Sequence, residues 1–479
     1  MDKLEAISPV DGRYRRYTEP LAEFFSEKTL IKYRVQVEGE YLIFLSEHPQ
    51  IGTRNFSEEE KDLVRKLYGL STENAAVVKA IEMKGYGDIK PTNHDVKAVE
   101  YYMKDMLRGT SLEAVEYYMK DMLRGTSLED SVEWIHFALT SEDVNNLAYG
   151  LMLSDALREV ILPAVDEVYR TIERLAQTYQ NIPLLARTHG QSASPTTFGK
   201  EFKVFSSRIK RQLDQVSVSE ILVKLNGATG NYNAHAVAYP QVDWLNFTRD
   251  FIGKFNKEGK TKLIPNLITT QIEPHDSYAE LFDNLRRLNT ILIDFNQDIW
   301  RYISDDWITQ KPVEGEVGSS TMPHKINPID FENSEGNLGL ANALFDYFSH
   351  KLPVSRLQRD LSDSTVERNF GVAFAHSLIS YRSILKGLNK ITVNESKVIE
   401  ELEKHPEIIS EAIQTVLRRE GMGTPYEKLK DLTQGRKVTM NDFRMFIDGL
   451  AVPEMIKDEL HQINPKNYTG IARLLVETK

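Results

Sequence analysis

Long seams of apolar residues constrain the fold of this chain more than any other feature. Within each seam, successive members lie three or four residues apart. Steps that average about 3.5 residues keep one stripe of a helix turned toward a partner helix. The seams therefore predict long helices packed nearly parallel in a bundle, with the stripes forming its core. Their members are Ile161, Val165, Val168, Ile172, Leu175 and Tyr179; Phe198, Phe202, Phe205, Ile209, Leu213 and Val216; and Leu281, Leu285, Leu288, Leu292, Phe295, Ile299 and Tyr302.

The predicted fold class is all-α, since strand signals are sparse outside these seams. A length of 479 residues suggests about three domains at roughly 150 residues each. We expect an N-terminal helical domain over 1–130, a central long-helix bundle over 131–388 and a C-terminal helical domain over 389–479. Long, nearly parallel helices often pack against copies of themselves, so we also expect an oligomer.

Charge and composition exclude several classes of function. The chain carries 59 basic and 70 acidic residues and no cysteine. Disulfides, thiolate metal sites and cysteine nucleophiles are thereby excluded, and without a basic run we expect no nucleic-acid partner. The N-terminus resembles no signal peptide, and no stretch of 18 apolar residues occurs. We therefore expect a soluble cytoplasmic protein with no membrane partner, in which local arginine clusters could still bind small anions.

One segment is duplicated without change. The sequence AVEYYMKDMLRGTSLE occupies 98–113 and again 114–129. Each copy predicts a helix that ends at Arg-Gly, followed by a Thr-Ser-Leu-Glu capping box for the next helix. Sixteen extra residues in one continuous helix would turn its apolar face away by about 160°. Our hypothesis is that one copy fills the native helix and the other is extruded or repacked.

Polar residues that break the helical pattern gather in a few stretches. Gly, Pro, His, Ser and Asn cluster there and indicate loops and helix ends, where functional residues concentrate. These stretches are 183–197, 226–244, 269–277 and 313–337.

The last of these stretches contains GSSTMPHKINP at 318–328. Its glycine and serines offer backbone N–H groups and hydroxyls, Lys325 adds a positive charge and Asn327 a further donor. Such a loop suits an anion whose charge grows during a reaction. By composition alone, a Ser/Gly loop is more often simply a loop.

The order of residues is more specific than their composition. The pattern Gly-Ser-Ser-x-Met-Pro-x-Lys-x-Asn resembles the signature loop of the fumarase/aspartase superfamily. Further segments resemble the adenylosuccinate lyase family, especially its bacterial branch, and the likeness covers nearly the whole chain. The duplication is the clear departure, because removing one copy restores the spacing of the family. The segments are SPVDGRY (8–14), TNHDVKAVEYY (92–102), IHFALTSEDVNN (135–146), RTHGQ (187–191), TTQIEPHD (269–276), SRLQRDLSDSTVERN (355–369), PYEKLKDLT (425–433) and FIDGLAVPE (446–454).

The resemblance implies a carbon–nitrogen lyase of purine and AMP biosynthesis. It would release fumarate by β-elimination from adenylosuccinate and from succinyl-aminoimidazole carboxamide ribotide, without a metal or an organic cofactor. The base of the family falls on Ser319, which needs positive charge nearby to ionise; Lys325 is the candidate. The acid falls on His189, oriented by Glu332. A serine that merely caps a turn is the alternative for Ser319.

Two further histidines match family histidines that line the site, His94 and His136. We expect His136 on a helix with an apolar face, so a satisfied core histidine is its alternative reading. An anionic purine substrate requires converging cations and hydrogen-bond donors. Arg187, Arg208 and Arg356 are left without a role, because surface ion pairs would account for them equally well. The implied substrate-binding residues are Arg13, Tyr14, Asn93, His94, Asp95, Thr140, Ser141, Gln271, Ser320, Lys325, Asn327, Asn333, Arg359, Ser364 and Arg368.

The resemblance also implies a homotetramer in which each site draws on three subunits. Another fumarate-releasing lyase of the superfamily, such as one acting on argininosuccinate, is the nearest rival. The family-specific segments 8–14 and 269–276 argue against it. A catalytically impaired homologue is a second alternative, because the duplication lies between two site segments.

Overall fold

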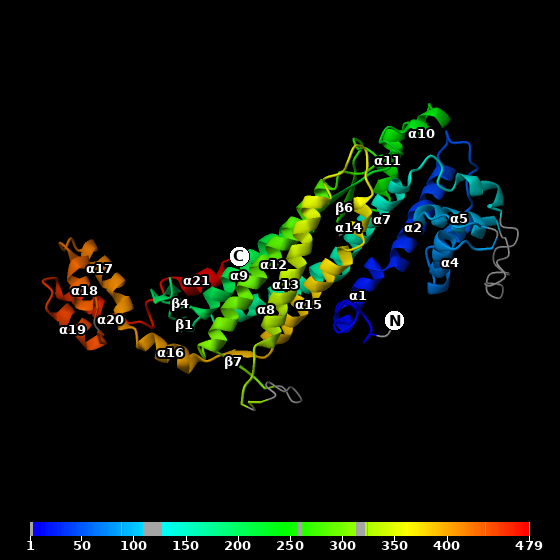
Figure 1. The fold of residues 1–479 in the computed structure, drawn as a ribbon. Helices are drawn as coiled ribbons and strands as arrows, with labels where there is room; N and C mark the ends of the chain where they lie inside the picture. Colours follow the sequence, from blue (N-terminus) through cyan, green and yellow to red (C-terminus); the bar gives the residue numbers. More distant parts are fainter. Residues whose placement is uncertain are drawn as a thin grey trace. The chain divides into compact units, whose positions relative to one another are not determined.

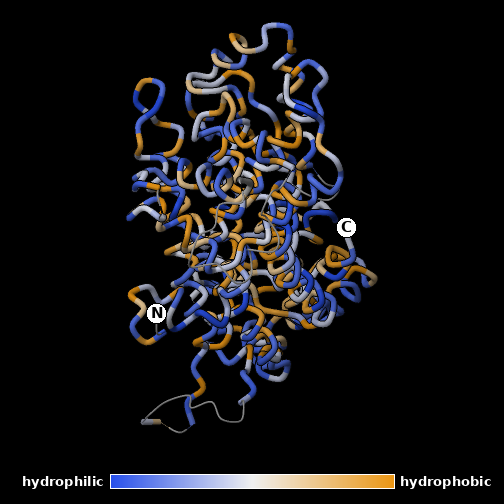
Figure 2. The backbone as a smooth tube through the Cα atoms, turned by 90° about the vertical axis from the view of Figure 1, so that its right-hand side faces the viewer, coloured by the Kyte–Doolittle hydropathy of each residue, from blue (hydrophilic) through white to orange (hydrophobic). Residues whose placement is uncertain are grey.

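The computed structural model describes residues 3–87, 89–108, 127–256, 261–312, 321–322, 324–435 and 437–478. Helices dominate these residues, and the strands among them are short (Figure 1), which confirms the predicted all-α class. In Figure 2 hydrophobic and hydrophilic stretches alternate at short intervals along the backbone. No helix within the described ranges is long and apolar enough to cross a membrane.

The chain divides into two compact units, each built from separate stretches. The first comprises Met1–Ala164, Gln212–Asn289 and Asn337–Ile379, and the second comprises Val165–Arg211, Thr290–Gly336 and Ser380–Lys479. These units interleave along the sequence, whereas the predicted domains are consecutive, so the three-domain division stays a prediction. Residues of both units occur in helices α8 (Leu162–Thr178), α9 (Phe198–Ser217), α12 (Asp276–Ser304), α13 (Ile329–Lys351) and α15 (Phe370–Leu388).

The other elements of the first unit are mostly helices, with one pair of parallel strands. The register of that pair aligns Glu220 with Lys262 and Val223 with Pro265. These elements are α1 (Arg15–Phe25), α2 (Glu27–Glu47), α3 (Glu58–Lys66), α4 (Thr72–Met83), α5 (Asp95–Arg108), η1 (Glu129–Trp134), α7 (Ser141–Ala156), η2 (Leu157–Ile161), β5 (Glu220–Val223), α10 (Asn233–Ala238), α11 (Trp244–Gly253), β6 (Lys262–Pro265) and α14 (Ser362–Glu367).

A continuous apolar core joins helices α2 to α5 and η1. Val35 on α2, Val78 on α4, Tyr102 on α5 and Val132 on η1 are all buried in it. Capping defines where these helices start. In α3, for example, Ser57 and Glu60 form a capping box, in which each side chain bonds the backbone N–H of the other. The loop between α4 and α5 carries two of the predicted site residues, Asn93 and His94.

The first copy of the duplication contributes directly to this core. Ala98, Val99 and Met103 are fully buried on α5, and the described part of this helix runs to Arg108, so its predicted end at Arg-Gly stays a prediction. Residues 109–126 lie outside the described residues. The fate of the second copy therefore stays a hypothesis.

Deleting residues 114–129 should leave turnover equal or improved and raise the melting temperature. The connection from Gly109 to Leu128 would shrink to Gly-Thr-Ser-Leu, and shortening a connecting segment about fivefold recovers roughly 1 kcal/mol of closure free energy. Helix α5 and η1 already lie close together, since Lys104 Nζ donates to Glu133 Oε2 at 3.0 Å. Calorimetry and a turnover assay of both chains would test this. An insoluble or inactive deletion variant would show that the second copy is required.

The second unit combines parts of the long helices with a smaller group of C-terminal helices. Two antiparallel hairpin-like pairs, β1 with β4 and β2 with β3, precede α9, and β7 pairs antiparallel with β8. Its further elements are β1 (Pro183–Leu184), β2 (Arg187–Thr188), β3 (Gln191–Ser192), β4 (Thr196–Thr197), β7 (Ile308–Gln310), β8 (Ile391–Val393), α16 (Glu395–Glu403), η3 (Pro406–Ile409), α17 (Ser410–Arg419), α18 (Pro425–Thr433), α19 (Met440–Asp448), α20 (Glu454–Gln462) and α21 (Ala472–Glu477).

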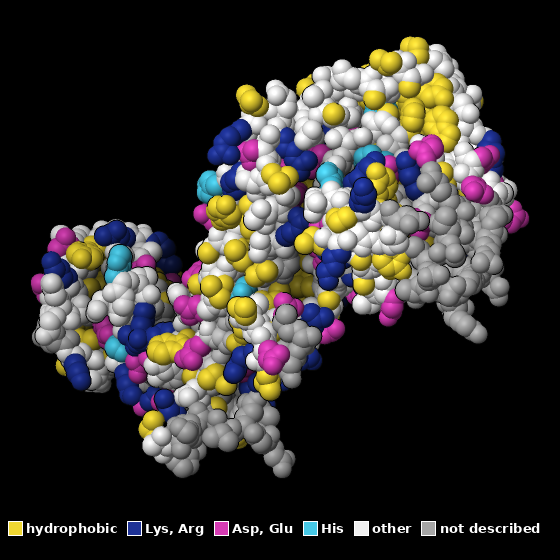
Figure 3. Space-filling view, turned by 45° about the vertical axis from the view of Figure 1, so that its right-hand side comes forward, with side chains coloured by type: hydrophobic (Ala, Val, Ile, Leu, Met, Phe, Trp, Pro, Cys, Tyr) yellow, Lys and Arg dark blue, Asp and Glu magenta, His cyan; other side chains and the backbone are white. Residues whose placement is uncertain are grey.

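The apolar seams form cores as predicted. Every member of the second seam is buried on or beside α9, and so are all members of the third on α12 except Tyr302. The rings of Phe205 and Phe295, one from each seam, meet edge to face at 5.2 Å. Buried polar contacts also link the helices of the second unit, since Asn296 Nδ2 on α12 donates to Ser334 Oγ on α13 at 2.9 Å. Figure 3 shows one face of the molecule, where basic, acidic and hydrophobic side chains are interspersed.

Candidate active site

Asp95 is the centre of a charged cluster in the first unit. It begins α5, and its Oδ2 accepts hydrogen bonds from Arg34 Nη2 at 2.7 Å and from Arg368 Nη2 at 2.8 Å. Its Oδ1 accepts a third from the backbone N–H of Val96 at 2.8 Å. The structure therefore brings together Asp95 and Arg368, which both belong to the predicted binding set. Arg34 is buried on α2 and was not predicted.

These contacts control the ionisation of Asp95. Burial alone would raise the pKa of this carboxyl, but the charge of Arg34, the Val96 N–H and Arg368 outweigh it and lower the pKa to about 2. Asp95 is thus ionised throughout the physiological range. Its carboxylate holds the guanidinium of Arg368, which remains 38% exposed, at the surface of the unit.

We expect Asp95→Asn to lower stability by about 2 kcal/mol at neutral pH. A lowered folded-state pKa stabilises the protein above the unfolded-state pKa, and this contribution is lost as the pH falls from about 5 toward about 2. The difference in melting temperature between variant and parent should therefore narrow over that interval. Glu459→Gln, which breaks the exposed pair with Arg419, is the control and should change the melting temperature little, because solvent screens an exposed ion pair. A difference that stays constant with pH would contradict the prediction.

His94 and Ser141 also meet in this unit. The backbone N–H of Lys97 donates to His94 Nδ1 at 3.3 Å, and His94 Nε2 lies 3.1 Å from Ser141 Oγ. An accepting Nδ1 assigns the proton of the neutral ring to Nε2, which then donates to the serine. Ser141 is the first residue of α7, and the Thr140–Asp143 capping box fixes this helix end.

Arg359 lies beside the same helix end. Its Nη2 is 3.0 Å from Glu142 Oε2, and its Nε is 3.4 Å from Asp363 Oδ2. Gln271 donates to the carbonyl of Ala228 at 3.1 Å.

The remaining predicted residues of the first unit lie at its surface or in loops. Ser364 Oγ donates to the carbonyl of Leu361 at 3.2 Å. Asn93 has a positive φ of 49° and is exposed. The Arg13 guanidinium lies 5.9 Å from the centre of the Tyr14 ring.

The prediction that His136 sits on a helix is wrong. His136 lies in a turn between η1 and α7, with a φ of 62°. Its Nδ1 is 2.5 Å from Glu38 Oε1. Burial acts to lower the pKa of His136, but the charge and hydrogen bond of Glu38 outweigh it and raise the pKa. An ion pair across 98 positions in sequence, rather than the local apolar pattern, sets this conformation.

His189 lies at the tip of a two-residue hairpin in the second unit. Thr188 pairs with Gln191, and the two loop residues His189 and Gly190 have φ of 53° and 76°. Positive φ at both positions is what a type I′ loop requires. The imidazole is therefore carried, exposed, on a short rigid turn.

The base of this hairpin is anchored to the C-terminal helices. Arg187 Nη2 lies 2.8 Å from Glu401 Oε1, and its guanidinium lies 5.7 Å from the Trp307 ring centre. Ser192 Oγ lies 3.1 Å from His405 Nδ1.

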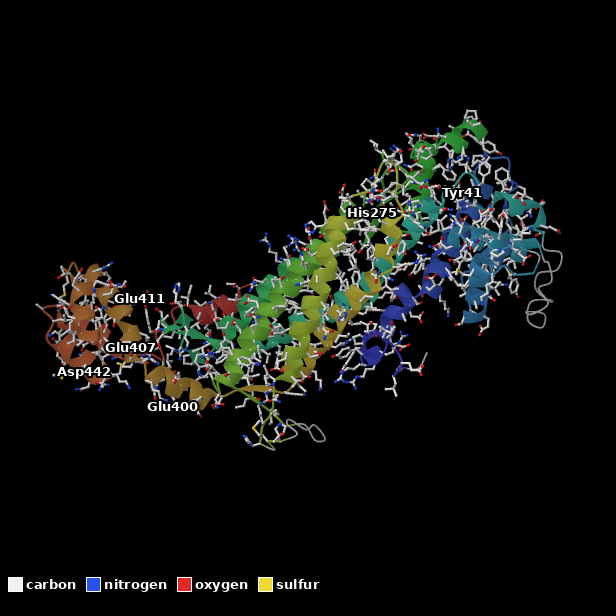
Figure 4. The ribbon with its side chains drawn as sticks, viewed as in Figure 1. Tyr41, His275, Glu400, Glu407, Glu411 and Asp442 are labelled. Atoms are coloured by element: carbon white, nitrogen blue, oxygen red, sulfur yellow. The ribbon has the colours of Figure 1, made fainter. Side chains whose placement is uncertain are left out.

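A second anchor follows at Ser194, which hydrogen-bonds Glu411 of α17. Tyr468 donates to the same carboxylate at 2.8 Å, and Glu411 is labelled in Figure 4. Arg187 and His405 thus have structural partners, as do Arg208 with Asp294 and Arg356 with Asp360.

The loop that precedes α13 is described only in part. Ser319 and Ser320 lie outside the described residues. Lys325 is exposed, and Asn333 Nδ2 donates to Ser383 Oγ at 2.8 Å. Glu332 accepts a hydrogen bond from Trp300 Nε1 at 3.0 Å, so its pairing with His189 stays a prediction, as do the roles of Ser320, Lys325 and Asn327.

The predicted residues divide between the two units. Arg13, Tyr14, Asn93, His94, Asp95, His136, Thr140, Ser141, Gln271, Arg359, Ser364 and Arg368 belong to the first, and His189, Ser319, Ser320, Lys325, Asn327, Glu332 and Asn333 to the second. Among the described residues, no group of three or more His, Cys, Asp or Glu is arranged to hold a metal ion.

Several charged residues of the first unit were not predicted from the sequence. Arg34, Glu38, Glu142, His275 and Glu367 are all buried. One signal was available for two of them, because Arg34 and Glu38 stand four residues apart inside a largely apolar stretch of α2. A buried charge needs a partner, and such a pair indicates one elsewhere in the fold.

Residues 12–342 match the family described as Lyase, and two solved structures share the fold. They are a 3-carboxy-cis,cis-muconate lactonizing enzyme from Pseudomonas putida (TM-score 0.68, 17% identity, 96% of this chain and 95% of that chain) and a fumarate lyase from Mesorhizobium sp. BNC1 (TM-score 0.64, 16% identity, 96% of each chain). The class is therefore a lyase of the fumarase/aspartase superfamily.

The C-terminal part of the chain narrows the class. Residues 355–469 match the family described as Adenylosuccinate lyase C-terminal. An adenylosuccinate lyase from Escherichia coli is 48% identical over 100% of this chain and 99% of its own length, and one from Dictyostelium discoideum is 46% identical over 98% and 97%. One from Haemophilus influenzae is 47% identical over 100% and 99%. The chain belongs to the adenylosuccinate lyase family.

Proposed function

We propose that this chain cleaves adenylosuccinate to AMP and fumarate, and cleaves succinyl-aminoimidazole carboxamide ribotide in the same way. The observation that carries the proposal is 48% identity to an adenylosuccinate lyase along the whole chain. The cations of the first unit support it. Arg359 and Arg368 each pair with an acidic side chain, and the Arg368 side chain is partly exposed, so it can meet an anionic nucleotide.

In the proposed reaction, the Ser319 alkoxide takes the proton from the carbon beside the succinyl carboxylate. The electron pair left on that carbon forms the double bond of fumarate as the carbon–nitrogen bond breaks. His189 donates a proton to the departing nitrogen. Lys325 stabilises the carboxylate as its charge grows, and Glu332 orients His189.

Self-association forms part of the proposal. A stripe on α13 within the first unit is exposed and apolar or small, comprising Gly339, Leu340, Ala343 and Tyr347. Leu340 and Tyr347 are 54% and 53% exposed, and a side chain at Gly339 would meet nothing within 4 Å. Such a helix face fits a second copy of a long-helix bundle. In a homotetramer, neighbouring subunits would contribute residues to a shared site.

The test is product formation by the purified chain. Adenylosuccinate, the succinyl ribotide and argininosuccinate would each be incubated with the enzyme, and fumarate and the second product measured by chromatography. We expect fumarate from the first two only. Fumarate from argininosuccinate alone would favour the rival lyase, and no product from any of the three would refute the proposal. Light scattering should give about four times the chain mass of 54.9 kDa.

A further inference from the structure

A sealed cluster of ionisable side chains lies behind the substrate-binding segments of the first unit. Its members come from α7, from the loop before α12 and from the segment around α14, and His275 is labelled in Figure 4. The carboxylates and the histidine are all at most 3% exposed, and the side chain of the single arginine is 14% exposed. The members are Glu142, Glu273, His275, Arg359, Asp363 and Glu367, with the hydroxyls of Tyr149 and Tyr278 nearby.

Contacts inside the cluster join these segments. His275 Nε2 lies 3.5 Å from Glu367 Oε1, and the backbone N–H of His275 donates to Glu273 at 2.7 Å. Arg359 bridges Glu142 and Asp363, as described above. Each segment also presents a predicted binding residue at the surface. Ser141 precedes Glu142, Arg368 follows Glu367, and Gln271 lies four positions before His275.

The charges of the cluster must balance, because an unpaired charge in a dry interior is very costly. Four carboxyl groups face one arginine and one histidine. Burial raises the pKa of Glu142 to about 8 and also raises the pKa of Glu273. Burial acts to lower the pKa of His275, but the adjacent Glu367 outweighs it and raises the pKa to about 9. A protonated His275 therefore supplies positive charge to Glu367, while Arg359 supplies it to Glu142 and Asp363.

Removing the charge of His275 would upset this balance. Glu367 would lose its cationic partner, and Arg359 would be the one cation left within the described cluster. The extra negative charge would draw the Arg359 guanidinium inward, away from the surface where it would meet substrate. The segment that carries Arg368 would also lose the contact that holds it from the buried side.

We propose that His275 is a positioning residue, whose imidazolium holds Glu367 and thereby keeps Arg359 and Arg368 placed for the anionic groups of the substrate. The inference rests on the proposed function, since Arg359 and Arg368 are binding residues only if the nucleotide is the substrate. His275 itself is fully buried and acts through these two arginines.

The test compares His275→Asn, Glu367→Gln and the double variant with the parent. For His275→Asn we expect KM for adenylosuccinate to rise about 10- to 100-fold, the loss of one charge-assisted contact, while kcat changes less than about threefold. In the double variant both partners are neutral, so KM should return to within about threefold of the parent. If the two substitutions only damaged the fold, their effects on KM would instead add, and the double variant would have a higher KM than either single variant.

The control is His376→Asn, another buried histidine of the same unit, whose Nδ1 lies 2.8 Å from Asn337 Oδ1. The KM of the His376→Asn variant for adenylosuccinate should stay within about twofold of the parental value. AMP binding measured by calorimetry on all variants gives a readout independent of turnover, and melting curves verify folding. An unchanged KM in His275→Asn, or no recovery in the double variant, would overturn this inference and leave the proposed function intact. A parent enzyme without turnover would overturn the proposed function itself.

Discussion

Replacing Ser319 with alanine should abolish turnover of adenylosuccinate while substrate binding remains largely intact. The hydroxyl is proposed to accept the proton from carbon, and alanine offers no atom that can do so. General acid–base groups typically contribute about 10²- to 10⁴-fold, and a loss at or above the upper end is expected because no neighbouring residue is assigned to replace the base. The rest of the loop, including Lys325, would still meet the substrate carboxylate.

The measurement is kcat together with the dissociation constant of adenylosuccinate, which an inactive variant allows calorimetry to determine directly. Thr321→Ala is the matched control, since it removes a hydroxyl two positions away in the same loop and should retain most of kcat. Near-normal rates in the Ser319 variant would remove this serine from its role. A large rise in the dissociation constant with little change in kcat would instead make it a binding residue.

The second large effect is expected at His189, where loss of the imidazole should lower kcat by about 10²- to 10⁴-fold. The hairpin geometry decides which substitution is informative. His189 has a φ of 53°, a conformation that costs most residues roughly 1–2 kcal/mol but that asparagine tolerates. Alanine would both remove the acid and strain the loop, whereas His189→Asn removes the acid and leaves the turn favourable.

We therefore expect His189→Ala and His189→Asn to lose kcat to a similar degree, with the alanine variant also melting at a lower temperature. Thr188→Ala, one position earlier in the hairpin, is the control and should keep most of the parental kcat. A loss of less than about tenfold in both His189 variants would point to another acid.

Much of the architecture could be predicted because the signals are local. The seams on α8, α9 and α12 follow from the spacing of apolar residues, and most of their members are buried in the structure. The helix predicted in the first duplicated copy is likewise present, as α5. The resemblance identified the adenylosuccinate lyase family, which the comparisons confirm.

The predictions were wrong or incomplete for charged residues whose ion-pair partners are distant in the sequence. His136 was expected on a helix, but its ion pair with Glu38 holds it in a turn with positive φ. Arg34 was overlooked because a basic residue on a helix usually faces solvent, whereas here it is buried against Asp95, 61 positions away. The spacing of Arg34 and Glu38 within an apolar stretch indicates that they need partners, but it does not say which distant residues those partners are.

The sequence by itself determined the helical class, the seams that become the cores and the family, because periodicity and motif order are properties of neighbouring residues. Only the tertiary structure decided which charges pair. Asp95 joins Arg34 to Arg368, and His275 faces Glu367 in a sealed interior. The physical reason is that burial makes an unpaired charge costly, so a buried ionisable group is defined by partners that folding brings from distant parts of the chain.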